Sequence, residues 1–142
     1  MSNRSDTRLF ADIAPGEFVT ALVSGRPTLC LKVERIGKEH VSHYLIPLDP
    51  LEDRSSLALI CVDPAGETVP EGGIALVFDE IDEIGGPEPG DVFVCRFGTF
   101  LKVIDDPRAQ RVHAYVDVET GLLRPRMERD VERRLTWRVR RG

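Results

Sequence analysis

Three runs of strand-forming residues lie within residues 89–121 and predict three short β-strands, and in the third run, residues 112–118, apolar and polar residues alternate. Three runs in this stretch are rich in β-branched and aromatic residues, and they cover residues 92–96, 99–104 and 112–118. Phe97-Gly98 lies between the first two runs, and the segment 105–108, with two aspartates and a proline, lies between the second and the third. Both connecting segments carry turn-forming residues. The pattern is typical of a three-stranded meander.

A shorter version of the same pattern begins near the N-terminus. The matching segments are Pro15-Gly16-Glu17 with Pro89-Gly90-Asp91, and Leu31-Lys32-Val33 with Leu101-Lys102-Val103. In each copy a histidine, His43 or His113, follows the valine by ten positions. The shared order and spacing predict that a three-strand unit occurs twice.

The segments between the two units predict further strands. Residues 57–62 are apolar at every position, which favours a strand that is covered on both faces. Residues 67–69 and 74–78 flank Pro70-Glu71-Gly72-Gly73 and predict a hairpin. Residues 79–91 hold six acids and no base together with glycines and prolines, and we interpret them as a solvated linker.

The two ends of the chain give weaker patterns. Residues 7–14 fit either one helical turn or a short edge strand. The spacing of Met127, Val131 and Leu135 permits a short helix over residues 127–134. Residues 135–140 then alternate, which predicts a half-buried terminal strand. Its apolar side carries Leu135, Trp137 and Val139.

We therefore expect an all-β protein of two SH3-like small-barrel repeats in one compact unit, with at most one short helix near the C-terminus. The expected divisions are an N-terminal tail or edge element (1–14), a first β repeat (15–78), an acidic Gly/Pro linker (79–88) and a second β repeat (89–142). Closing the sheets would remove the exposed strand edges along which β proteins aggregate.

The composition is typical of a globular protein and also indicates the cellular compartment in which we expect it. With 142 residues and 42% hydrophobic residues, the chain can bury one core. It has no apolar run of membrane-spanning length and no secretory signal pattern, so we expect a cytoplasmic protein of bacterial type without membrane contact. Cys30, Cys61 and Cys95 all lie in apolar runs, where we expect them to be buried and reduced.

Charge is unevenly distributed along the chain. The net charge is −5, yet the last 21 residues hold eight arginines and three acids. The binding candidates among these arginines are Arg133, Arg134, Arg138, Arg140 and Arg141. They can contact nucleic-acid phosphates, or they can pair with the acidic remainder of the protein or with a second subunit. We favour protein pairing, because aromatic side chains that stack bases are scarce there.

No established catalytic or nucleotide-binding motif occurs in the sequence. It has no GxSxG, HExxH, Walker loop or GxGxxG. The assignment as an enzyme stays uncertain, with the balance against it, and no cofactor is expected. His43 and His113 are metal-ligand candidates if the two repeats bring them together, but spacing supplies no third ligand, and a polar position on the solvent face of a strand is the favoured alternative.

Four short segments of the N-terminal half follow one another in a recognisable order: Gly16-Glu17, Gly25-Arg26-Pro27, Leu29-Cys30-Leu31 and Ile46-Pro47-Leu48. This order resembles the signature of the SH3-like barrel of ribonuclease toxins in the MazF/PemK group. The resemblance covers about a quarter of the chain and implies a small barrel. The sequence departs from the signature at Asp49, where the family has a hydroxyl-bearing residue, so the resemblance implies a fold and no activity.

These observations favour a non-catalytic binding or assembly module. We expect a protein partner or self-association through strand edges and charged faces. The alternative is a barrel that binds RNA or DNA, or resembles a ribonuclease toxin, and that uses the arginine-rich terminal strand.

Overall fold

The computed structural model describes residues 7–81, 85–106, 109–125 and 127–142, and in these residues the protein is all-β. The strands are β1 (Arg8–Leu9), β2 (Phe18–Val23), β3 (Arg26–Ile36), β4 (Val41–Asp49), β5 (Ile60–Cys61), β6 (Glu67–Glu71), β7 (Ile74–Ile81), β8 (Val92–Cys95), β9 (Gly98–Asp106), β10 (Ala109–Asp117), β11 (Leu123–Arg124) and β12 (Arg133–Arg141). Two short 3-10 turns, η2 (Phe10–Asp12) and η3 (Arg54–Ser56), complete the regular structure.

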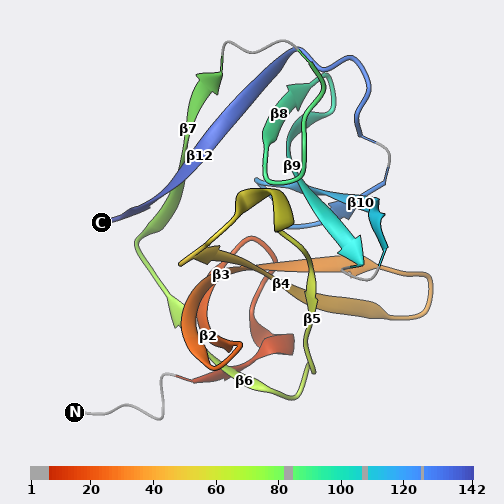
Figure 1. The fold of residues 1–142 in the computed structure, drawn as a ribbon. Coiled ribbons are helices and arrows are strands. Elements are labelled where there is room, and N and C mark those ends of the chain that lie inside the picture. The colour runs from red at the N-terminus through yellow and green to blue at the C-terminus, as the bar shows by residue number, and fades with distance from the viewer. Residues whose placement is uncertain (1–6, 82–84, 107–108, 126) are drawn as a thin grey trace.

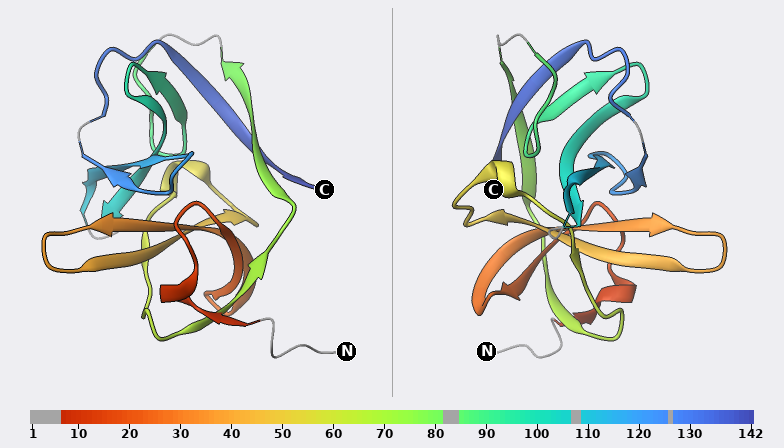
Figure 2. Two further views of the ribbon diagram at one scale, coloured as in Figure 1. Left: turned by 180° about the vertical axis from the view of Figure 1, so that it is seen from behind. Right: turned by 45° about the vertical axis from the view of Figure 1, so that its right-hand side comes forward.

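The strands form two six-stranded antiparallel sheets. The first has the order β1-β6-β2-β3-β4-β5, and the second has the order β11-β10-β9-β8-β12-β7. The first sheet lies below the second in Figure 1, and the β3–β4 hairpin projects to one side of the body in Figure 2. The hairpins β2–β3 and β8–β9 lie in different sheets. Their paired registers start from Phe18 opposite Leu31 and from Val92 opposite Leu101.

The main core lies between the two sheets. Leu31, Val33 and Ile46 from the first sheet pack with Val92, Leu101 and other buried residues of the second. Leu135, Trp137 and Val139 of β12 face this core, as the alternation predicts, and Leu135 and Trp137 are buried there. A smaller apolar cluster covers the opposite face of the second sheet. It contains Phe93, Cys95, Phe100 and Tyr115.

Two short parallel bridges connect the N-terminal half of the chain, which forms the first sheet, to the C-terminal half. Ile104 of β9 exchanges backbone hydrogen bonds with Leu57 and Leu59, at 2.8 and 3.0 Å. The backbone N–H of Glu34 in β3 donates to Gly121 O at 3.1 Å, and Glu34 bridges Leu122. The long strand of each half is thus held by a segment that follows the third strand of the other half.

The apolar run 57–62 is mostly not a strand, contrary to the sequence prediction. Only residues 60–61 form β5, and Ala58 makes an isolated bridge to Ile104. Leu57 and Leu59 face the core while Cys61 is exposed, so the expectation that Cys61 is buried is wrong. Within this run Leu57 and Leu59 are buried in the core, and Ala58 between them is not fully covered by other parts of the protein.

The predicted hairpin of residues 67–78 is also wrong, because its two strands belong to different sheets. β6 pairs with β1 and β2, whereas β7 pairs with β12. Gly73, with a φ of 72°, lies where the chain passes from one sheet to the other. β7 continues to Ile81 and includes Asp79 and Glu80, which the charge pattern had placed in a linker. Residues 82–84 lie outside the described residues.

The structure gives a different outcome at each end of the chain, where the sequence pattern was weak. The N-terminal segment forms both a short edge strand, β1, and the 3-10 turn η2. The described residues of 127–132 contain no helix, and Asp130 has a left-handed φ of 54°. Met127 and Val131 instead pack against the aromatic cluster of the second sheet. No helix in the described part of the chain has the length and apolarity required to cross a membrane.

Trp137 attaches β12 to the rest of the molecule. Its side chain is 3% exposed, its indole N–H donates to Gly90 O at 2.8 Å, and the Arg54 guanidinium lies 4.2 Å from the ring centre. We expect Trp137→Ala to lower the free energy of unfolding by about 3–5 kcal/mol, because it opens a cavity and leaves Gly90 O unpaired. Urea denaturation would measure this. Trp137→Phe, which keeps a ring, should cost clearly less, and equal costs would contradict the packing role.

Candidate functional site

The β7 strand is the long unpaired edge of this structure. The other edge strands, β1, β5 and β11, have two residues each, whereas β7 has eight. Among the described residues β7 pairs only with β12, and Figures 1 and 2 show its outer side free of other strands. Proteins commonly protect long edges with proline, lysine or bulges. β7 contains no proline or lysine, and its register with β12 is regular throughout.

The register shows which peptide groups of β7 point to the free edge. Residues 73 and 142 lie opposite each other, and Gly142 N–H donates to Gly73 O at 2.9 Å. In an antiparallel pair, hydrogen-bonded and non-hydrogen-bonded residue pairs alternate. The odd residues of β7 therefore bond to β12. Those whose N–H and C=O groups point away are Ile74, Leu76, Phe78 and Glu80.

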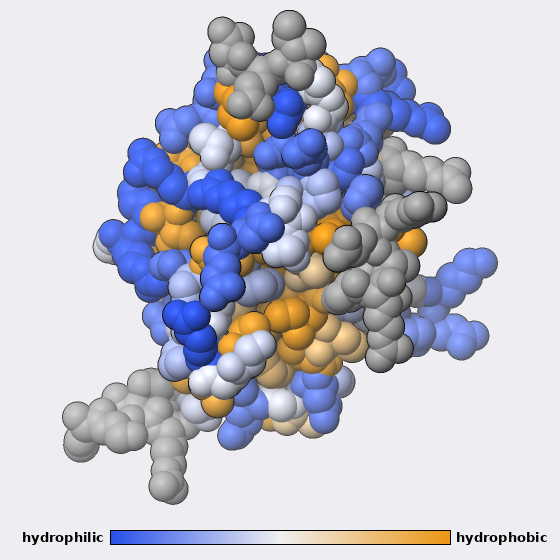
Figure 3. Space-filling model, in the orientation of Figure 1, coloured by the Kyte–Doolittle hydropathy of each residue, from blue (hydrophilic) through white to orange (hydrophobic). Residues whose placement is uncertain are grey.

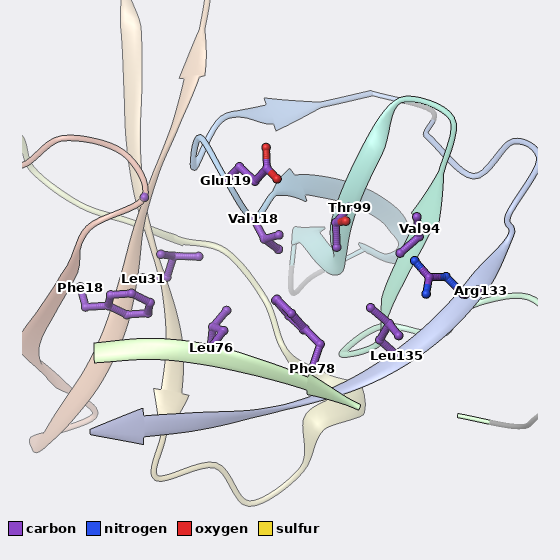
Figure 4. A pocket seen from close by; sticks show the side chains of 11 residues that line it. Phe18, Leu31, Leu76, Phe78, Val94, Thr99, Val118, Glu119, Arg133 and Leu135 are labelled. Carbon is purple, nitrogen blue, oxygen red and sulfur yellow. The ribbon is translucent and has the colours of Figure 1, made fainter. Parts of the chain in front are cut away.

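A cavity of about 400 Å³ adjoins the inner face of β7. Leu76 and Phe78 extend from β7 into it, toward Phe18 and Leu31 of the first sheet (Figure 4). The second sheet contributes further apolar walls through Val94, Leu135 and Val118. The residues whose backbone faces the free edge thus also place their side chains in the cavity.

Polar groups lie on the cavity lining at only a few points. Thr99 and Glu119 lie beside Val118 on the far wall, and Arg133 lies beside Leu135 (Figure 4). Arg133 donates to Glu80 of β7 at 2.7 Å, and both side chains are more than half exposed. A mostly apolar cavity with a few polar groups is suited to bind an apolar side chain.

The outer face of the β7–β12 ribbon is charged. Arg138 lies opposite Val77 and Arg140 opposite Ala75. In the orientation of Figure 1, hydrophilic residues dominate this side of the surface, and apolar side chains gather on the lower part of the same face (Figure 3). β7 thus places Leu76 and Phe78 toward the cavity and Ala75, Val77 and Asp79 on the outer face, where the arginines belong to the neighbouring β12.

Most of the arginines proposed from the sequence are bonded to carboxylates of the same chain. The pairs are Arg133–Glu80 at 2.7 Å, Arg134–Asp91 at 2.6 Å, Arg138–Asp79 at 3.5 Å and Arg141–Asp49 at 3.2 Å. Arg140 is exposed and makes no hydrogen bond or ion pair with any described residue. The structure thus places all five on one strand, but it does not leave them as a free cationic surface.

The two histidines proposed as metal ligands lie in different sheets. His43 in β4 faces Glu34, with 3.5 Å between Nδ1 and Oε2, and His113 in β10 lies opposite Ile104. Within the described ranges no group of three or more His, Cys, Asp or Glu side chains is placed to hold a metal ion.

Two buried lysines are the most unusual polar groups, and both have structural partners. Lys32 is fully buried, and its ammonium group donates to Phe10 O, Ile13 O and Glu34 Oε2 at 2.8, 2.8 and 2.9 Å. These bonds use every donor of the group. A lysine that is saturated in this way has no free donor or lone pair for chemistry.

Lys102 is the counterpart of Lys32 in the second half and is 7% exposed. It donates to Pro87 O at 3.0 Å and to both oxygens of Glu128 at 2.9 and 3.0 Å. The Tyr115 hydroxyl also donates to Glu128. Burial, followed by the hydrogen bond and the charge of Glu128, raises the pKa of Tyr115 well above its usual range, so the phenol stays protonated.

No catalytic arrangement is found in the described residues. The buried lysines are saturated, and Cys30 and Cys95 are buried. Burial raises the pKa of the Cys30 thiol to about 12, which suppresses the nucleophilic thiolate. What the arrangement offers is an edge of peptide groups beside an apolar cavity. This combination can bind an extended polypeptide.

Sequence reasoning missed β7 as a site and the burial of the lysines. The apolar run 74–78 was visible, but nothing local showed that it would pair with the C-terminal strand. The matched Leu-Lys-Val segments were the available signal for the lysines, because a charged residue between buried neighbours in a strand must find partners on its own face.

The chain matches no protein-family model, no curated protein and no solved structure.

The lysine contacts give a direct test of their structural role. We expect Lys32→Met to lower the free energy of unfolding by about 3–5 kcal/mol, because it leaves two carbonyls and Glu34 without their cation. Lys38→Met, at the exposed tip of the β3–β4 hairpin, should change it by less than about 0.5 kcal/mol. Denaturation of both variants provides the comparison, and similar stabilities would show that Lys32 is dispensable.

Thiol exposure gives a second test. Of the three cysteines, Cys61 is exposed and the other two are buried. We expect an aromatic disulfide reagent to modify Cys61 rapidly in the folded protein and to reach Cys30 and Cys95 only after unfolding. Cys61→Ser should abolish the rapid phase. Rapid modification of that variant would place one of the other thiols at the surface.

Proposed function

We propose that this protein is a non-catalytic assembly module that binds an extended segment of a protein along β7. The single observation that carries the proposal is the eight-residue unpaired edge of β7, whose edge-facing residues also line the adjoining cavity. Main-chain hydrogen bonds to a strand edge supply affinity, and a pocket for alternate side chains supplies specificity.

The scaffold in this proposal is a pair of related SH3-like units. Matched contacts support the relation. The N–H of Gly16 donates to Lys32 O and that of Gly90 to Lys102 O, each at 2.8 Å, and both glycines have a φ of 92°. Each unit then exchanges one short bridge with the other. We place the module in the cytoplasm, because its cysteines are unpaired.

The nucleic-acid alternative has less support. Four of the five proposed arginines are bonded to carboxylates, which lowers the positive potential that phosphates require. A catalytic role also lacks support, because the described residues contain no nucleophile, acid and base that converge. The contacts favour a surface that binds protein backbone over one that binds a polyanion.

The proposal predicts which amides a bound strand protects. A short peptide selected from a displayed random library would be added to the isotope-labelled protein, and amide exchange followed by NMR. We expect exchange at Leu76 and Phe78 to slow by about tenfold or more, because their N–H groups point to the free edge. Exchange at Ala75 and Val77, already bonded to β12, should change little.

The alternation between even and odd residues is the internal control of this measurement. A peptide that binds near β7 without extending the sheet would shift neighbouring signals without this alternating protection. If selected peptides instead protect the β3–β4 hairpin, or the groove of the first sheet that Phe10, Leu22 and Cys61 line, then β7 is not the binding edge and the proposed function is wrong.

A further inference from the structure

We infer that the segment bound along β7 is β7 of a second copy of this chain, in an antiparallel pair with Val77 on the twofold axis. This inference rests on the proposed function and identifies its partner. The pairing would join the second sheets of two subunits into one continuous sheet across β12, β7, the partner's β7 and the partner's β12.

Backbone alternation restricts the possible registers. In β7 the even residues present their peptide groups to the free edge, so an added antiparallel strand must place its own edge-facing residues opposite them. A twofold axis at Val77 meets this condition and pairs residues 74–80 of one copy with residues 80–74 of the other. Each subunit would contribute equally, with about eight new backbone hydrogen bonds in total.

The side chains of β7 are complementary to themselves in this register. On the inner face Leu76 lies opposite the partner's Phe78, and Phe78 opposite the partner's Leu76. Cross-strand pairs of an aromatic and an aliphatic residue stabilise antiparallel sheets. Both residues already line the cavity, so the cavities of the two subunits would adjoin through these pairs. With Phe78 on the axis, Glu80 would instead lie opposite the partner's Leu76, which is unfavourable.

The charges on the outer face support the same register. Asp79 would lie opposite the partner's Ala75, and Ala75 lies opposite Arg140 of its own subunit. Arg140 is exposed and unpartnered among the described residues, and the small Ala75 leaves its side chain room to cross. Two strand spacings separate the groups by about 10 Å at the backbone. An extended arginine side chain spans most of this distance, so each copy would gain one ion pair.

A charge-swap experiment tests both the partner and the register. Val77→Lys and Val77→Glu each place like charges directly opposite each other on the axis, and we expect each to weaken dimerisation at least tenfold relative to wild type. An equimolar mixture places Lys opposite Glu and should restore a heterodimer. Light scattering coupled to gel filtration, over a range of concentrations, measures the mass of each sample.

A matched control carries the same charge one strand away from the edge. Thr136 lies on the same outer face in β12, opposite Asp79, and accepts an exposed hydrogen bond from Arg54 at 3.1 Å. Thr136→Lys removes that bond but leaves the edge of β7 unchanged, so this variant should dimerise like wild type. The buried Trp137 reports folding of every variant through its emission. If Val77→Lys fails to fold beside Arg138, then Val77→Glu, which faces the same arginine with the opposite charge, still tests the axis.

Disulfide trapping gives an independent measure of the register. Val77 and the partner's Val77 would form a non-hydrogen-bonded pair with Cα atoms about 4.5 Å apart, which suits a disulfide. In a Cys61→Ser background, Val77→Cys should form a covalent dimer under mild oxidation. Ala75→Cys, which would lie opposite the partner's Asp79, should form much less.

The outcomes separate this inference from the proposed function. One outcome is a wild-type chain that stays monomeric at all concentrations and yet binds selected peptides along β7. That result overturns the inference that the partner is a second copy, and it supports the proposed function. Dimers that survive Val77→Lys and Val77→Glu overturn the inference, because another surface then holds the subunits together. A mixture of the two variants that fails to pair also overturns it, by excluding the register.

Discussion

The structure depends on two lysine ammonium groups held inside a protein with little other buried charge. Each joins the long strand of its half to the turn that opens that half, because Lys32 binds Ile13 O and Lys102 binds Pro87 O, three residues before Gly16 and Gly90. The ammonium group is stable there only while its acceptors stay in place. Each lysine therefore fixes the opening turn, the turn sets the hairpin register, and the two hairpins define the surfaces that enclose the core.

The second opening turn also positions the candidate edge. Gly90 O accepts the Trp137 N–H, which holds β12 against the turn, and β7 is placed through its pairing with β12. The residue at position 90 must be glycine, because its φ is 92° and a Cβ would collide with the Arg54 carbonyl. A rigid framework thus supports β7 along one side while its other side has no neighbour in the sheet. That is the arrangement expected of a surface that binds a strand without reorganising.

The local pattern of residues was sufficient to predict many of the strands, but it predicted little of the candidate site. The strand-forming runs in 89–121 predicted β8, β9 and β10, and the alternation in 135–140 predicted β12, because both signals are properties of neighbouring residues. Pairing between β7 and β12 depends on residues far apart in the sequence, and no local pattern indicates it. Cys61 was misplaced for a related reason: the run 57–62 is uniformly apolar, so it does not show which side faces the core. The alternation placed the arginines on one strand, but their carboxylate partners lie on β4, on β7 and in the turn before β8, far away in the sequence.

The order of β7 and β12 along the chain has a consequence for biosynthesis. β7 emerges from the ribosome well before β12, so during translation it has no partner on either side. On polysomes, nascent chains that each display an unpaired β7 lie close together, and an apolar strand in this state is prone to pair with its neighbours before folding is complete. The acidic pair Asp79 and Glu80 at the end of β7 acquires its arginines only when β12 is made. Until then the unpaired acids of neighbouring chains repel one another, which disfavours early pairing at this end of β7.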